Sequence, residues 1–106
     1  MESYRNVIKE LVKFAKREYQ EKRPQTVKVL RIKDIGVLTL GGPFKTLSIR
    51  KSQNPYYIVS VEYKENLRIY LFTKEGVLIE GINQDINPKL LNQLKKNTTT
   101  EYKVPR

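Results

Sequence analysis

Hydrophobic residues recur at helical spacing in two parts of the chain. Between residues 4 and 19 they follow steps of three and four, which predicts an amphipathic helix that Pro24 brings to an end. Asn87 and Pro88 predict the start of a second, shorter helix, with Asn as its cap and Pro in its first turn. The apolar positions are Tyr4, Val7, Ile8, Leu11, Val12, Ala15 and Tyr19 in the first helix, and Leu90, Leu91 and Leu94 in the second.

Between the two predicted helices the chain is rich in Val, Ile, Leu, Tyr and Thr, which are typical of β-strands. Short groups of turn-forming residues separate these segments, and such short links favour an antiparallel meander. In the first segment the apolar pattern changes phase at Val29 and Leu30, which indicates either a β-bulge or burial of both faces. The predicted strands span residues 26–33, 37–40, 45–51, 56–63, 67–73 and 77–82.

These elements predict an α+β fold with a long N-terminal helix, an antiparallel meander of five to six strands and a short C-terminal helix. A chain of 106 residues is large enough for one domain, which we expect to span residues 1–96. Residues 97–106 have little apolar content, so we expect a flexible tail there. The first helix should cover one sheet face. The rest of the expected core consists of Leu47, Ile49, Val59, Val61, Ile69, Leu71, Val77, Ile79, Leu90 and Leu94.

The chain is strongly basic, with 21 Lys and Arg against 11 Asp and Glu and a net charge of +10. The excess is spread along the sequence, and a folded domain of this charge most often meets nucleic acid. The absence of Cys and His excludes disulfides, thiolate metal sites and a histidine general base. No apolar run reaches the roughly 20 residues that span a bilayer, so we expect a cytoplasmic protein with no membrane partner.

The first predicted helix carries Arg5, Lys9, Lys13 and Arg17, one cation every four residues. Like charges on neighbouring turns destabilise a helix by a few tenths of a kcal/mol per pair, so an anion that neutralises them would stabilise it. Successive members of the row rise about 6 Å along the helix axis, which is comparable to the spacing of phosphates on a nucleic-acid strand. The row therefore indicates either phosphate binding or an ordinary solvated face.

A second pattern lies in the predicted strand 67–73 and its end, where Arg68, Tyr70, Phe72 and Lys74 alternate with aliphatic residues. Strand geometry sends the two sets to opposite faces. If the aliphatic set meets the core, the other face offers two rings between two cations, an arrangement that binds single-stranded nucleic acid. The alternative is that the two rings pack beneath the first helix.

Residues 39–96 contain short motifs in a distinctive order: GGPFKTLSIR at 41–50, IVSVEY at 58–63, TKEG at 73–76, EGIN at 80–83 and PKLLNQLKK at 88–96. In this order they resemble the positive transcription cofactor family, single-stranded DNA-binding coactivators with a four-stranded antiparallel sheet and a C-terminal helix. The resemblance implies a homodimer joined partly through its C-terminal helices, with sheet faces that cradle unpaired strands. Its basic site positions would be Arg50, Arg68 and Lys74.

A third motif is the acid-x-Lys triplet of Glu62 and Lys64, with Asp34 and Glu10 as further carboxylates. Restriction-endonuclease-like nucleases use such a set to hold Mg²⁺, because hard cations prefer carboxylate oxygens. The simpler interpretation is that a Lys two residues after a Glu is common in a Lys-rich strand.

The sequence as a whole favours a non-catalytic nucleic-acid-binding protein, preferring single strands with little sequence specificity, and forming a homodimer. We expect no cofactor, no metal and no small-molecule substrate. The alternatives are a protein-interaction module that docks an acidic partner and a small Mg²⁺-dependent nuclease. The predicted phosphate contacts are Arg5, Lys9, Lys13, Arg17, Arg50, Arg68 and Lys74, and the predicted base-stacking residues are Tyr70 and Tyr56.

Overall fold

A five-stranded antiparallel sheet lies at the centre of the computed structural model, which describes residues 4–33, 38–42, 45–49, 55–86 and 88–105. For residues 4, 38–42 and 45–49 the description covers the backbone alone. The elements in chain order are α1 (Tyr4–Lys22), β1 (Thr26–Ile32), β2 (Leu38–Gly42), β3 (Lys45–Ile49), β4 (Tyr57–Glu62), β5 (Asn66–Phe72), β6 (Leu78–Asp85), α2 (Pro88–Asn97) and β7 (Thr98–Val104).

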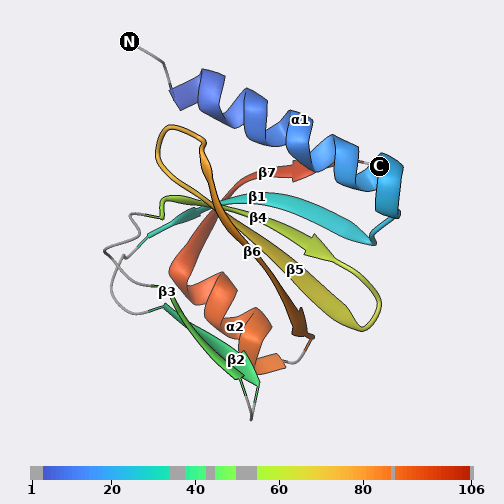
Figure 1. The fold of residues 1–106 in the computed structure, drawn as a ribbon, viewed down its shortest axis with the longest axis vertical. Coiled ribbons are helices and arrows are strands. Elements are labelled where there is room, and N and C mark those ends of the chain that lie inside the picture. Colours follow the sequence, from blue (N-terminus) through green and yellow to red (C-terminus); the bar gives the residue numbers. More distant parts are fainter. Residues whose placement is uncertain (1–3, 34–37, 43–44, 50–54, 87, 106) are drawn as a thin grey trace.

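The elements are stacked in layers, which Figure 1 shows from the side. The central sheet has the strand order β6-β5-β4-β1-β7. Helix α1 covers one face of it over β1, β4 and β7, and α2 packs on the opposite face. The hairpin of β2 and β3 lies beyond α2, so that α2 is enclosed between the hairpin and the sheet. The fold is therefore α+β, as the sequence predicts.

Alternation along the strands creates two separate hydrophobic cores, one on each face of the sheet. In β4, Val59 and Val61 face α1 and Ile58 faces α2, and all three are fully buried. The core on the α1 face contains Val7, Leu11, Ala15, Val27, Val29, Tyr57, Val59, Val61, Tyr70, Phe72 and Val104. The core on the α2 face contains Leu30, Ile32, Ile58, Leu67, Ile69, Leu71, Leu90 and Leu94.

The flexible tail expected for residues 97–106 is wrong, because Thr98–Val104 forms strand β7 along the outer side of β1. β-Branched residues such as Thr favour strands, and here the two ends of the segment, Thr98 and Val104, are both buried. Pairing of β1 with β7 shifts register between Val29 and Leu30. The extra residue lies in β7, where Glu101 falls between the partners Thr100 and Tyr102, and β1 itself stays in register with β4. The change of phase at Val29 and Leu30 therefore marks burial of both faces of β1.

The expected simple meander is also wrong in one respect. Strands β4, β5 and β6 follow one another as predicted, but β2 pairs with β3 in a separate two-stranded sheet, and β1 takes the place beside β4. A tight hairpin has the same local turn signals whether or not it joins a larger sheet, so its sequence does not show where it docks. The side chains of Leu47 and Ile49, two expected core residues, lie outside the described part of the structure.

Most of the other expected core residues are buried, but the start of β6 is an exception. Val77 is 61% exposed, so its placement in the core is wrong, and Ile79 is partly buried against the α2-face core. Strand β6 is an edge strand, and Val77 lies in the turn before it. The hydrophobic residues that begin an edge strand have neighbours on one side alone, which explains their exposure.

Candidate functional site

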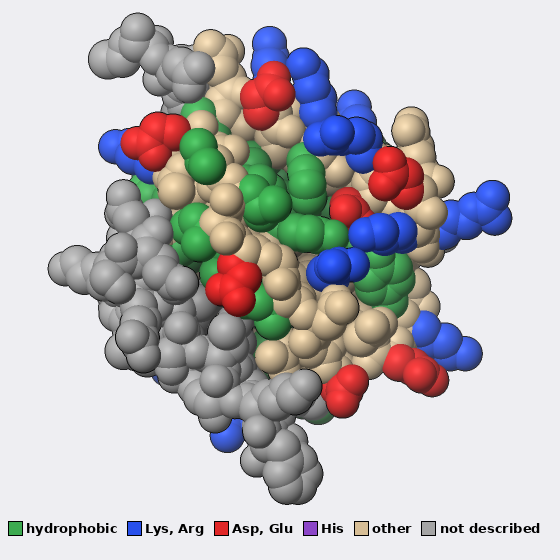
Figure 2. Space-filling model, in the orientation of Figure 1, with side chains coloured by type: hydrophobic (Ala, Val, Ile, Leu, Met, Phe, Trp, Pro, Cys, Tyr) green, Lys and Arg blue, Asp and Glu red, His purple; other side chains and the backbone are tan. Residues whose placement is uncertain are grey.

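The row of cations on α1 lies on the side of the helix that faces away from the sheet. Arg5, Lys9, Lys13, Lys16 and Arg17 are all exposed, because the helical repeat turns them away from the buried residues of the opposite side. Figure 2 shows Lys and Arg side chains gathered along this helix, next to a hydrophobic area of the same surface.

One acidic side chain pairs with this row. Glu10 Oε1 lies 3.3 Å from Lys13 Nζ, and both side chains are about 70% exposed (69% and 71%). An exposed pair of this kind contributes little to stability and is screened by salt. It therefore leaves Lys13 available to an incoming anion.

Two arginines lie over a pair of aromatic rings where α1 meets β5. The Phe14 and Tyr70 rings meet edge to face with their centroids 4.8 Å apart. Arg17 Cζ lies 5.8 Å from the Phe14 centroid, and Arg68 Cζ lies 5.3 Å from the Tyr70 centroid, which are distances for cation–π contact. The structure thus brings Arg68 of β5 and Arg17 of α1 to the same side of the sheet.

Arg68 is half-buried, and its Nε atom is shielded from solvent. Within the described part of the chain this Nε has no hydrogen-bond partner. A buried donor without a partner is uncommon in folded proteins and carries a desolvation cost. An anion bound to the rest of the Arg68 side chain would not reach this shielded atom, so the unpaired Nε is a cost of the packing at this junction.

Tyr70 does not have the role that the sequence predicts for it. Its ring is 7% exposed and packs beneath Phe14, and its hydroxyl donates a hydrogen bond of 3.0 Å to Glu18 Oε1. Burial, followed by this hydrogen bond, raises the pKa of Tyr70 to about 12. The ring also lies over Gly81, where an added Cβ would approach it to 3.2 Å. Base stacking on Tyr70 is therefore wrong, and Phe72 is buried in the same core.

Glu18 is the buried centre of this junction, a role that the sequence analysis does not assign to it. It is 7% exposed, and its Oε2 lies 3.6 Å from Lys22 Nζ, the i, i+4 partner one turn later. The pKa of the half-buried Tyr63 is raised by burial and then by the charge of Glu18. The sequence does contain a signal for this position, because Glu18 comes three residues after Ala15 and so continues the buried side of the helix.

The other predicted site residues are placed as follows. Tyr56 is half-buried, with its ring edge to face on Tyr57 at 4.7 Å, and it packs against the α1-face core. Lys74 is exposed in the turn between β5 and β6. Arg50 lies outside the described residues.

The turn that carries Lys74 lies beside the first half of α1. An added Cβ at Gly76 would come within 3.2 Å of Val7 Cγ1, and the positive φ of Gly76 (85°) favours glycine there. A pocket of about 470 Å³ separates the turn from the helix, and Lys9 and Lys13 line it. Glu10 and Glu75 line it as well, so its charge is balanced.

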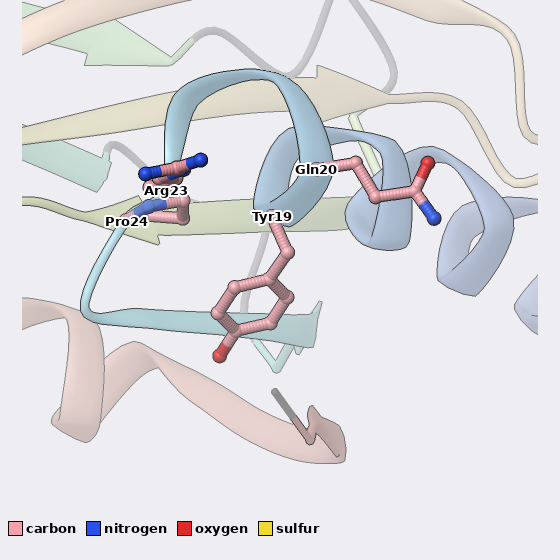
Figure 3. Close-up of a pocket in the computed structure, with 4 residues that line it drawn as sticks. All are labelled: Tyr19, Gln20, Arg23 and Pro24. Carbon is pink, nitrogen blue, oxygen red and sulfur yellow. The ribbon is translucent and has the colours of Figure 1, made fainter.

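Another pocket, of about 380 Å³, lies at the end of α1 and is shown in Figure 3. Tyr19 extends from the helix toward the strands, where its hydroxyl donates to the carbonyl oxygen of Val104 at 2.9 Å and accepts from the amide of Val27 at 3.1 Å. Arg23, which follows the helix, has a φ of 48°. Since the Tyr19 hydroxyl already joins β1 to β7, this pocket has a structural explanation.

The residues considered for a nuclease are not gathered into one site. Glu10 lies on α1, whereas Glu62 lies on the α2 face of β4, across the sheet from it, and Asp34 lies outside the described residues. Among the residues that the structure describes, no three His, Cys, Asp or Glu side chains form a group that could hold a metal ion. No helix in the described ranges has the length and apolar character required to cross a bilayer.

Comparison with known proteins gives the same outcome in each case: no family model, no curated protein and no solved structure matches this chain. The resemblance of residues 39–96 to the positive transcription cofactor family therefore stays a prediction from short motifs. In the structure β3 pairs with β2 and not with β4, which differs from the four-stranded sheet that the resemblance implies.

Proposed function

We propose that this protein binds nucleic acid without catalysing a reaction, and that it contacts phosphate groups through the outer side of α1 and through Arg68. The observation that supports this most is the placement of two sets of cations on one side of the sheet. Arg17 and Arg68 are joined there by the contacting rings of Phe14 and Tyr70. The proposal includes a cytoplasmic location.

The charge distribution favours a polymer over a small anion as the partner at this surface. Helix α1 has 19 residues, which at 1.5 Å per residue extend over roughly 28 Å. Exposed cations occur from Arg5 to Arg17 along it, and they lie too far apart to enclose one small group. A chain of phosphates can contact several of them at once.

The predicted preference for single-stranded nucleic acid depends on aromatic rings of β5 that bases can reach, and the structure does not provide such rings. Tyr70 and Phe72 are buried, and Tyr56 is half-buried. Phosphate contacts are common to single and double strands and carry no sequence information. The proposal is therefore for binding with little sequence specificity to either form.

The test is a fluorescence-anisotropy titration of labelled single-stranded and duplex oligonucleotides at several salt concentrations. For each phosphate contact, log K should fall with log salt with a slope of about −0.7 on single strands and about −0.9 on duplex. The variant Lys9→Gln/Lys13→Gln should reduce the slope on single strands by about 1.4.

The matched control is Lys89→Gln/Lys96→Gln, which removes the same charge from exposed positions of α2. It should leave the slope unchanged. Absence of binding at low salt, or an equal loss in both variants, would contradict the proposal.

A second candidate function is self-association through β6, which the exposure of Val77 (61%) and Leu78 (49%) favours. These residues begin an edge strand, whose outer backbone groups are open to pairing. Sedimentation velocity should then show a dimer that Val77→Ser/Leu78→Ser converts to a monomer. A monomeric wild-type protein at high concentration would contradict this candidate.

A further inference from the structure

The α2 face of the sheet contains a groove that the proposed nucleic-acid contacts do not use. Helix α2 has ten residues and covers the aliphatic half of this face, where Leu30 pairs with Ile58. Two residues further along each strand, on the same face, Lys28 pairs with Ser60. From this pair onward the face is polar. At this boundary the structure has a pocket of about 410 Å³.

One wall of this pocket is apolar. It is formed by the buried side chains of Leu30, Leu67 and Leu94 and by Leu91, which is 36% exposed. An apolar wall beside open solvent favours a ligand with an apolar body. The pocket volume lies toward the lower end of the range for small-molecule sites.

The other side of the pocket offers hydroxyl groups. Ser60 and Thr98 are each 7% exposed, and Thr100 is exposed. The Thr98 hydroxyl donates to the carbonyl oxygen of Leu94 at 2.6 Å, which leaves its oxygen as an acceptor. Ser60 and Thr100 are the hydroxyls placed to donate to a ligand.

The charge around the pocket is predominantly positive. Lys28 lines it and stands directly opposite Lys103 in the pairing of β1 with β7. Like charges directly opposite each other on neighbouring strands are destabilising, so an anion between them would be favoured. Lys95 adds a third cation, at the end of α2, and Glu62 is the carboxylate in the lining.

We infer that this groove binds a small amphiphilic anion, whose apolar body lies on the leucines and whose acidic head lies between Lys28 and Lys103. Ser60 and Thr100 donate hydrogen bonds to the head group. Lysines act here as point charges without the planar fork of arginine, so the site selects negative charge more than head-group shape. It lies across the sheet from α1 and is independent of the proposed nucleic-acid contacts.

Octanoate is a suitable probe, because it combines one negative charge with a short apolar chain. Isothermal titration of the full chain should show saturable binding of octanoate in the millimolar range or tighter. Neutral 1-octanol and inorganic phosphate should each bind at least about tenfold more weakly, since each lacks one of the two required features. Equal binding of either one would overturn the inference.

Lys28→Gln is the decisive variant, because removing one of two opposed lysines relieves repulsion and should not impair folding. It should weaken octanoate binding about tenfold and raise the unfolding midpoint slightly when no anion is present. The same variant should leave oligonucleotide binding unchanged, which separates this site from the proposed function.

The matched control is Lys9→Gln, which removes one charge from the far side of the molecule. It should bind octanoate as the wild type does. A second variant, Leu91→Asp, tests the apolar wall at an exposed position and should also weaken binding. No saturable binding to the wild type, or an equal loss in Lys9→Gln and Lys28→Gln, would overturn the inference.

Discussion

The two faces of the central sheet are packed with different kinds of side chain. Among the described residues, the α1-face core includes aromatic residues such as Tyr57, Tyr70 and Phe72, whereas the α2-face core consists of leucine and isoleucine. Buried phenols require hydrogen-bond partners, and Tyr70 finds one in Glu18. Aliphatic side chains require burial alone. The α1-face core therefore combines hydrophobic packing with a hydrogen bond between two titratable groups, Tyr70 and Glu18, whose strength depends on pH. The buried cluster of the α2 face contains no titratable side chain among the described residues.

The largest expected effects come from truncating the residue through which each helix is anchored. Leu11→Ala on α1 and Leu90→Ala on α2 each remove a fully buried side chain and should cost about 2–5 kcal/mol. Leu91→Ala, at a partly exposed position, should cost less than about 1 kcal/mol. Urea unfolding monitored by circular dichroism measures all three.

The same measurement shows whether the two faces unfold together. The near-ultraviolet signal reports mainly on the α1 face, where Tyr19, Tyr57 and Tyr70 lie, and the far-ultraviolet signal reports on the whole fold. We expect coincident transitions in Leu90→Ala. Loss of helix signal before loss of the tyrosine signal would show that the α2 face unfolds separately.

The next effect is a pH dependence that belongs to the α1 face. The pKa of Tyr70 is about 12 in the folded protein and near 10 in the unfolded chain, so the folded state binds more protons between these values. Its contribution to stability is complete below about pH 10 and is lost as pH rises toward about 12. We expect a loss of about 2 kcal/mol over this range.

Tyr70→Phe tests this assignment, because it removes the titrating group and keeps most of the ring packing. The difference in unfolding free energy between about pH 9 and about pH 11.5 should become smaller in this variant. Tyr102→Phe, at a 40% exposed position, is the control and should retain the wild-type difference. An unchanged pH dependence in Tyr70→Phe would contradict the assignment.

An effect of similar size concerns the two hydroxyl groups that hold β7 from opposite faces. Tyr19→Phe leaves the Val27 amide and the Val104 carbonyl without their shared partner and should cost about 1–3 kcal/mol. Thr98→Val removes the single hydrogen bond to Leu94 and should cost about 1 kcal/mol. Hydrogen exchange of the β7 amides should increase in both. A larger loss in Thr98→Val than in Tyr19→Phe would contradict this ranking.

The smallest effect is a gain in stability at the end of α1. Arg23 has a φ of 48°, a left-handed conformation that costs a residue with a Cβ roughly 1 kcal/mol. Arg23→Gly should relieve this cost and raise the unfolding midpoint, as glycine does at many helix ends. Arg23→Ala keeps the cost and removes the charge, so it is the control. A lower midpoint in Arg23→Gly than in Arg23→Ala would show that the side chain stabilises the helix end.

The sequence predicts the parts of this fold that depend on local pattern. The spacing of Val7, Leu11 and Ala15 places α1 on the sheet, and the change of phase at Val29 and Leu30 indicates that both faces of β1 are buried. It does not predict β7, because a run of threonines is polar by composition and becomes a strand through pairing with β1, which is distant in sequence.

In the candidate site, too, the features that depend on local pattern can be predicted from the sequence and those that depend on tertiary contacts cannot. The exposed cations of α1 follow from helical periodicity, whereas the accessibility of Tyr70 depends on what covers β5. Phe14 of α1 covers the Tyr70 ring. The sequence does indicate that Phe14 turns toward the sheet, because it lies seven residues after Val7 and three after Leu11 on the same side of the helix. The groove near Lys28 was not predicted, because Lys28 and Lys103 become neighbours through strand pairing alone.

The partnership of β1 with β7 has a consequence for biosynthesis. Tyr19 and Val104, which share a hydrogen bond in the finished molecule, are separated by 85 positions in the chain. At ordinary rates of translation the ribosome needs seconds to make that stretch, and β1 meanwhile has an unsatisfied edge. We expect the nascent chain to reach its native state only after the threonine-rich segment has left the exit tunnel and paired with β1.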